Sequence, residues 1–87
     1  MKAIYKLQFS CGRQGTLYGI FVEKVERVEE LIASKEEIYF GEVMGKHSEV
    51  IGPLDETDIV LITTDETAIA VFEEHNLETG YNPFDYL

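Results

Sequence analysis

A regular alternation of apolar and polar side chains opens the chain and leaves few ways to fold it. From Lys2 to Cys11 the odd positions are apolar and, apart from Ile4, the even positions are polar. This period of two is typical of a strand with one buried face. A segment bracketed by Gly12 and Gly15 follows, and glycine readily adopts the positive φ of a hairpin turn. Residues 16–23 carry β-forming side chains on both faces, so we predict a hairpin whose second strand is central in a sheet.

The later segments switch between helical and strand spacing. Apolar positions with helical spacing predict a helix that begins near Val25 and ends near Ser34. A second helix is predicted after a cap at Thr64 or Asp65. Pro83 indicates that the C-terminal tail does not run as a helix through that position. Three further strands are predicted, over residues 37–44, 49–51 and 58–63.

The element order is therefore ββαβββα followed by an aromatic tail. We predict one small α+β domain over residues 1–87, with a mostly antiparallel sheet and both helices on one face of it. The hydrophobic content of 45% is high enough for a folded core.

Three observations bear on location. The longest apolar stretch, residues 59–62, is far shorter than the ~20 residues of a membrane span. The N-terminus lacks the apolar core of a signal peptide. The single cysteine, Cys11, cannot form an internal disulfide and suits a reducing compartment. We therefore expect a cytoplasmic protein that does not contact a membrane.

The charge is strongly negative and unevenly distributed. The net charge is −10, with 17 acidic and 7 basic residues, which argues against general binding of DNA or RNA. Residues 1–24 hold four cations against Glu23 alone, whereas residues 25–87 hold sixteen carboxylates and three cations. The first quarter of the chain therefore offers a small anion a favourable local field despite the overall negative charge.

The segment around Gly45 has the densest chemistry. Lys46, His47 and Ser48 follow it directly, and glycine beside lysine lets backbone N–H groups approach a phosphate. A P-loop is excluded, because only three residues separate Gly41 from Gly45 and His47 follows the lysine. A solvated hairpin turn without a ligand is the alternative. We give the two equal weight, because loops carry function more often than cores do.

The first turn is a second candidate binding segment. Arg13 offers a fork of donors to phosphate or carboxylate, and Gln14 adds an amide. An exposed hairpin tip is the favoured alternative.

The C-terminal tail is the third candidate. Tyr81, Phe84, Tyr86 and Leu87 are too apolar for a frayed end. We weigh packing on the protein's own core first, a subunit interface second, and a platform for base stacking third.

Catalysis and metal binding have no supporting pattern. Cys11 has no histidine near it in sequence. His47 and Ser48 are adjacent, and adjacent side chains rarely point in the directions that a catalytic triad requires. His47 and His75 lack paired ligand spacing. We assign no catalytic residue, no metal and no cofactor, and we do not expect an enzyme.

Two strings of the sequence resemble a known group. YFGEVMGKHSEV at residues 39–50 and GYNPFDY at residues 80–86 are similar to small uncharacterised proteins encoded by bacteriophages and prophages. The resemblance also includes the CGRQG turn at residues 11–15. It implies an accessory phage protein in the bacterial host cytoplasm, where many proteins of this size oppose host defences. It assigns no activity and no site residue.

Two hypotheses follow for function. The first is a non-catalytic, homo-oligomeric protein that sequesters a small anionic nucleotide signal. Its phosphates would meet Arg13, Lys46 and His47, and its base would stack on Tyr39 or the tail. The second is an acidic inhibitor that docks on a basic groove of a host defence protein, such as a nuclease, as a mimic of nucleic acid.

Overall fold

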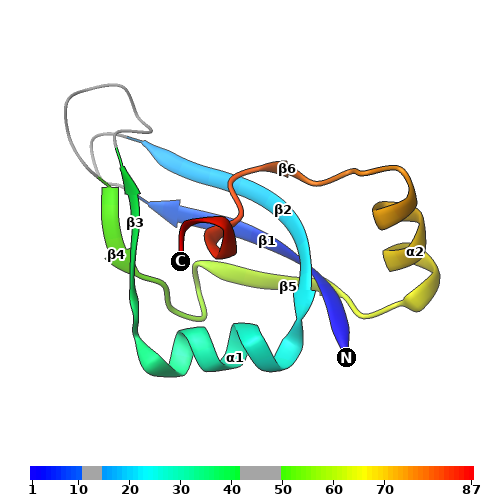
Figure 1. Ribbon diagram of the computed structural model, residues 1–87, viewed down its shortest axis with the longest axis horizontal. Coiled ribbons are helices and arrows are strands. Elements are labelled where there is room, and N and C mark those ends of the chain that lie inside the picture. The colour runs from blue at the N-terminus through cyan, green and yellow to red at the C-terminus, as the bar shows by residue number, and fades with distance from the viewer. Residues whose placement is uncertain (11–14, 42–49) are drawn as a thin grey trace.

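Strands β1 and β2 form the long central hairpin on which the rest of the fold is built (Figure 1). The computed structural model describes residues 1–10, 15–41 and 50–87. The elements are β1 (Lys2–Ser10), β2 (Thr16–Lys24), α1 (Val25–Ser34), β3 (Glu37–Gly41), β4 (Val50–Pro53), β5 (Ile59–Thr63), α2 (Glu66–Glu74), β6 (Thr79–Gly80) and the 3-10 helix η2 (Pro83–Tyr86).

The strands form two antiparallel sheets. The main sheet has four strands in the order β5-β1-β2-β6, and β3 pairs with β4 in a separate two-stranded sheet. The predicted α+β class, with two helices and a mostly antiparallel sheet, is therefore confirmed.

The main core lies on the face formed by the odd residues of the central hairpin. Tyr5 of β1 stacks on Phe21 of β2 with ring centroids 5.9 Å apart. Helix α1 covers this face with Val28 and Leu31, and the small sheet adds Phe40. Side chains of the strands alternate between the two faces of a sheet, and those of the helix return to the same side every three to four residues. Both sets therefore meet in one apolar layer that is removed from water.

The two helices pack on opposite faces of the main sheet, so the prediction that both lie on one face is wrong. Helix α2 places Ile69 and Phe72 against Ile4 of β1, with Ile20 and Val22 of β2 at the edge of this second cluster. The physical reason is the central strand itself. Because β2 is apolar on both sides, each side needs its own cover.

Glycines shape the small sheet. Gly41 has φ of 77°, and the pairing shifts register between Tyr39 and Gly41, as in a β-bulge. Strand β4 continues through Gly52 and Pro53, two residues beyond its predicted end. A side chain at Gly52 would lie 2.9 Å from the ring of Phe9, so glycine here admits an aromatic ring rather than ending the strand.

The C-terminal part contains two short elements that the sequence pattern did not predict. Strand β6 has two residues, and η2 begins at Pro83. Proline is acceptable as the first residue of a helix because its missing N–H would have no partner there. The side chain of Asn82 caps this turn by accepting a hydrogen bond from the N–H of Phe84 at 3.0 Å.

Candidate functional site

Most of the predicted ligand residues fall outside the described part of the chain. Three of them, Tyr39, Tyr81 and Phe84, are described. The others lie within residues 11–14 and 42–49, which are outside the described ranges: Arg13, Gln14, Lys46, His47 and Ser48.

The described ends of the two hairpins lie side by side. The ring of Phe9, near the end of β1, is 6.0 Å from that of Phe40, near the end of β3. Residues 11–14 connect β1 to β2, and residues 42–49 connect β3 to β4. The two segments that contain Arg13 and Lys46 are therefore joined to neighbouring strand ends.

Tyr39 alternates with buried neighbours. Ile38 and Phe40 point into the core, whereas Tyr39 is 51% exposed. It is the one described member of the predicted ligand set that the strand pattern directs to solvent.

The aromatic tail packs on the protein's own core, the first of the three alternatives considered for it. The ring of Phe84 meets Phe21 edge to face at 6.0 Å. The guanidinium carbon of Arg27 lies over the Phe84 ring, 4.9 Å from its centroid. Tyr86 contacts Phe40 with centroids 4.9 Å apart and Tyr81 at 6.5 Å. These contacts join the tail to β2, α1 and β3.

Helix α1 displays an acidic face. Val28 and Leu31 are buried, whereas Glu26, Glu29 and Glu30 are exposed. Positions separated by three and four residues lie on the same side of a helix, so these carboxylates form one patch, which we call the α1 acidic face. The side chains Val28 and Leu31 anchor it to the core, so the helix cannot rotate the patch inward without exposing apolar surface.

The electrostatic surroundings of this face are visible in two pKa shifts. The pKa of Glu26 is lowered, first by its own backbone N–H and then by the N-terminal ammonium, whose nitrogen is 3.3 Å from Oε1. The pKa of Tyr5 is raised, first by burial and then by the negative charges of Glu29 and Glu26. The negative charges of the helix therefore also affect the ionisation of Tyr5 in the core beneath them.

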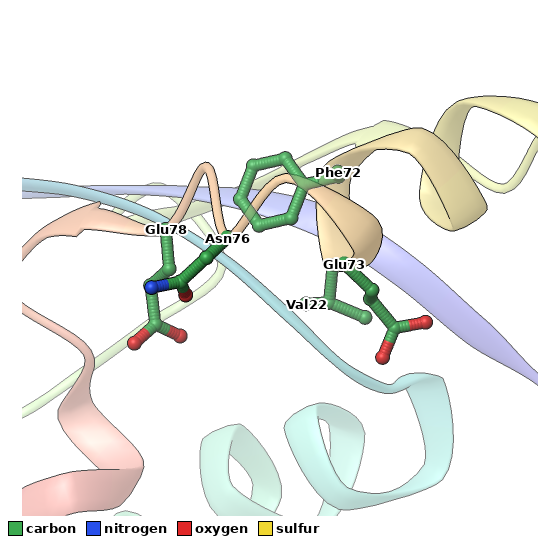
Figure 2. Close-up of a pocket in the computed structure, with 5 residues that line it drawn as sticks. All are labelled: Val22, Phe72, Glu73, Asn76 and Glu78. Atoms are coloured by element: carbon green, nitrogen blue, oxygen red, sulfur yellow. The ribbon is translucent and has the colours of Figure 1, made fainter.

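A second acidic feature is a depression between β2 and the end of α2. Its volume is about 240 Å³, and its lining is Val22, Phe72, Glu73, Asn76 and Glu78. Figure 2 shows Glu73 and Glu78 at opposite ends, with Phe72 and Asn76 between them. Glu73 is also paired with Lys2, at 3.2 Å. A hollow lined in this way repels anions and does not suit a phosphate.

In the three described ranges, no three His, Cys, Asp or Glu side chains are grouped so as to hold a metal ion. His75 is the C-cap residue that follows α2, and its backbone N–H donates to the carbonyls of Glu73 and Val71. None of the helices formed by these residues has the length and apolar character needed to cross a bilayer.

Sequence reasoning did not single out the outer side of β5. Val60, Leu61 and Ile62 are each about half exposed, at 46%, 45% and 49%. A continuous apolar run is typical of a buried strand, so the run alone suggested nothing unusual. Only the strand order, which places β5 at the edge of the main sheet, reveals this surface.

Comparison with known proteins found no matching family model, no similar curated protein and no similar solved structure.

Proposed function

We propose that this chain is a non-catalytic binding protein that docks its acidic surface onto a basic groove of a partner protein. The observation that carries the proposal is the α1 acidic face, in which three exposed carboxylates are held on one side of a helix anchored in the core. A surface of this kind attracts a protein that normally binds nucleic acid phosphates.

The charge of the whole chain supports the same proposal. The net charge is −10, and among the described residues no charged side chain is buried. The carboxylates of the described residues are therefore at least partly exposed to solvent. Long-range attraction to a basic partner raises the association rate and weakens steeply as salt increases.

The setting follows from the resemblance to small bacteriophage and prophage proteins. It makes a bacterial host the source of the partner, and a defence nuclease with a basic groove is the class that the charge fits best. Binding without turnover is proposed because the sequence offers no arranged nucleophile and base.

A capture experiment tests the proposal. The immobilised protein is incubated with bacterial lysate, and captured proteins are identified at about 0.05 M and about 0.5 M NaCl. We expect a nucleic-acid-binding protein that is retained only at low salt and is lost with the combined substitutions Glu26→Gln, Glu29→Gln and Glu30→Gln. The matched control replaces three exposed carboxylates elsewhere, Glu66→Gln, Glu74→Gln and Asp85→Asn.

The two triple variants change the net charge equally, so they separate the α1 acidic face from total charge. Equal loss in both would reduce the proposal to unspecific attraction. Retention by the α1 variant, or capture that is insensitive to salt, would contradict it.

The nucleotide hypothesis is the second candidate, and one observation favours it. The contact between Phe9 and Phe40 brings together the strand ends that lead to Arg13 and Lys46. Cations from distant parts of the chain would thereby meet one phosphate, and Tyr39 offers an exposed ring for a base.

Calorimetric titration with cyclic and ADP-ribose-type nucleotides tests this second candidate. We expect heat with at least one of them, lost in Arg13→Ala and Lys46→Ala but kept in Lys35→Ala, which removes a cation beyond α1. No heat with any nucleotide would exclude it. Sedimentation of the same samples tests the predicted homo-oligomer.

A further inference from the structure

Strand β5 is the outer strand of the main sheet. Among the described residues it pairs with β1 and with no other strand. The N–H of Gln8 donates to the carbonyl of Asp58 at 2.7 Å just before β5 begins. Because antiparallel pairing alternates, Val60 then faces Lys6, whereas Ile59 and Leu61 direct their backbone N–H and C=O groups away from β1.

This edge has only part of the usual protection against strand pairing. Natural edge strands are commonly short or bulged, or carry lysine, proline or a charge. The pairing of β1 with β5 shifts register between Leu61 and Thr63, but residues 59–61 pair regularly. The opposite edge of the same sheet, β6, is only two residues long. Strand β5 has five residues with the sequence IVLIT, and Val60, Leu61 and Ile62 are about half exposed.

Carboxylates stand at both ends of this apolar edge. Before β5, a turn is fixed by two hydrogen bonds: the N–H of Thr57 donates to Asp55 Oδ1 at 2.8 Å, and the N–H of Asp55 donates to Asp58 Oδ2 at 3.0 Å. After β5, Asp65 caps α2 by accepting from the N–H of Thr67 at 3.1 Å. The carboxylates are therefore held in place, at the two ends of a strand about 17 Å long.

The charge pattern selects the occupant. A second copy pairing antiparallel through β5 would bring the Asp58 end of one chain against the Asp65 end of the other, and like charges at such an interface are unfavourable. An extended segment with Lys or Arg on both sides of an apolar stretch would instead match the edge in charge as well as in hydrogen bonding.

We propose that β5 adds a strand from the partner protein: an extended apolar segment of about five residues flanked by basic side chains. The partner's backbone would pair with Ile59 and Leu61, its apolar side chains would cover Val60 and its neighbours, and its cations would meet Asp55, Asp58 and Asp65. This inference rests on the proposed function, since it gives the basic partner a defined docking mode.

The test uses a synthetic peptide of sequence KKVTVTVKK, titrated into the intact protein by calorimetry. Two further peptides serve as controls: the acid-flanked EEVTVTVEE and a basic peptide N-methylated at all five central residues, which cannot donate along either edge. We expect binding of the first peptide alone.

A matched pair of substitutions locates the site. Val60 and Val71 are both 46% exposed, on β5 and α2 respectively. We expect Val60→Lys to weaken peptide binding by about tenfold or more through charge repulsion and loss of apolar contact, and Val71→Lys to change it by less than about twofold. Circular dichroism checks that both variants keep the fold.

Three outcomes would overturn the inference: equal binding of the N-methylated or acid-flanked peptide, equal binding by Val60→Lys, or self-association of the protein that Val60→Lys abolishes. Its failure is distinguishable from failure of the proposed function. If the peptide does not bind but lysate capture still depends on the α1 acidic face, only the docking mode through β5 is wrong.

Discussion

Two carboxylates in the turn before β5 have pKa values shifted in opposite directions. The pKa of Asp55 is lowered, first by the hydroxyl of Thr57 and then by that residue's N–H, which both donate to the carboxylate. The pKa of Asp58 is raised, first by burial and further by the charge of Asp55. Ionisation of Asp55 therefore favours the folded state, whereas ionisation of Asp58, three residues further along the chain, disfavours it.

We expect Asp58→Asn to raise the free energy of unfolding at about pH 7, because ionised Asp58 is less stable in the folded chain than in the unfolded one. A raised folded pKa means that this carboxyl favours folding only when protonated, so its contribution is lost as pH rises. The gain should disappear near pH ~2.5, where the carboxyl is protonated in both states. Urea unfolding at the two pH values measures it.

Asp55→Asn is the matched control with the opposite sign. Its lowered folded pKa stabilises the fold above the unfolded pKa and is lost as pH falls through the folded value. We therefore expect this variant to be less stable than the natural chain at about pH 7, with a difference that shrinks as pH falls through the folded pKa of Asp55. The same sign of change in both variants would contradict the assignment of causes.

Glycine at position 19 is required by a close approach between β2 and the tail. A side chain there would lie 1.9 Å from the backbone oxygen of Tyr81. We expect Gly19→Ala to lower the free energy of unfolding by about 2–3 kcal/mol, the upper part of the range for overpacking. Gln8→Ala on the neighbouring strand, at an exposed position, should change it by less than about 0.5 kcal/mol. Equal urea midpoints for the two variants would show that the tail can move aside.

At the scale of elements, the C-terminal tail is a structural part of the fold. Its 3-10 helix η2 is capped by Asn82, and its Phe84 contacts both Phe21 and Arg27. Edge-to-face and cation–π contacts of this kind add to the apolar area that is buried.

We expect Phe84→Ala to destabilise the fold by about 2–3 kcal/mol, less than the ~3–5 kcal/mol of a fully buried Phe because Phe84 is only partly buried. Thermal or urea unfolding measures the loss. Leu87→Ala, at a position 56% exposed, is the control and should cost less than about 0.5 kcal/mol. A Phe84→Ala variant as stable as the control would mean that the tail is dispensable.

At the scale of the whole molecule, negative charge dominates. The described ion pairs are few and exposed, namely Glu26 with the N-terminus, Lys2 with Glu73, and Arg27 with Glu23. Exposed pairs of this kind contribute little, so they do not offset the mutual repulsion of a chain with net charge −10.

We expect stability to rise between about 0.02 M and about 0.5 M NaCl, because salt screens this repulsion. The α1 triple variant, Glu26→Gln with Glu29→Gln and Glu30→Gln, removes three negative charges and should show a shallower rise. Thermal unfolding across the salt series measures both slopes. A fall in stability with salt would show that attractive pairs outweigh repulsion.

The local order of the chain was predictable from its spacing of apolar residues. The hairpin of β1 and β2, the end of α1 near Ser34 and a cap of α2 at Thr64 or Asp65 all follow from neighbours in sequence, and the structure has Asp65 as the cap. Each depends mainly on the properties of neighbouring residues, so the local sequence pattern predicts it. The acidity of α1 was likewise predictable, since helical spacing alone places its carboxylates together.

Tertiary structure alone decided which faces meet and which strands are left at an edge. The sequence of β2 indicates two apolar faces but not that α1 takes one and α2 the other, and the apolar run of β5 does not reveal that β5 ends the sheet. The sequence around Gly19 likewise does not predict its close approach to Tyr81. These features depend on pairings between residues far apart in the chain, and a short pattern of side chains is compatible with several such pairings.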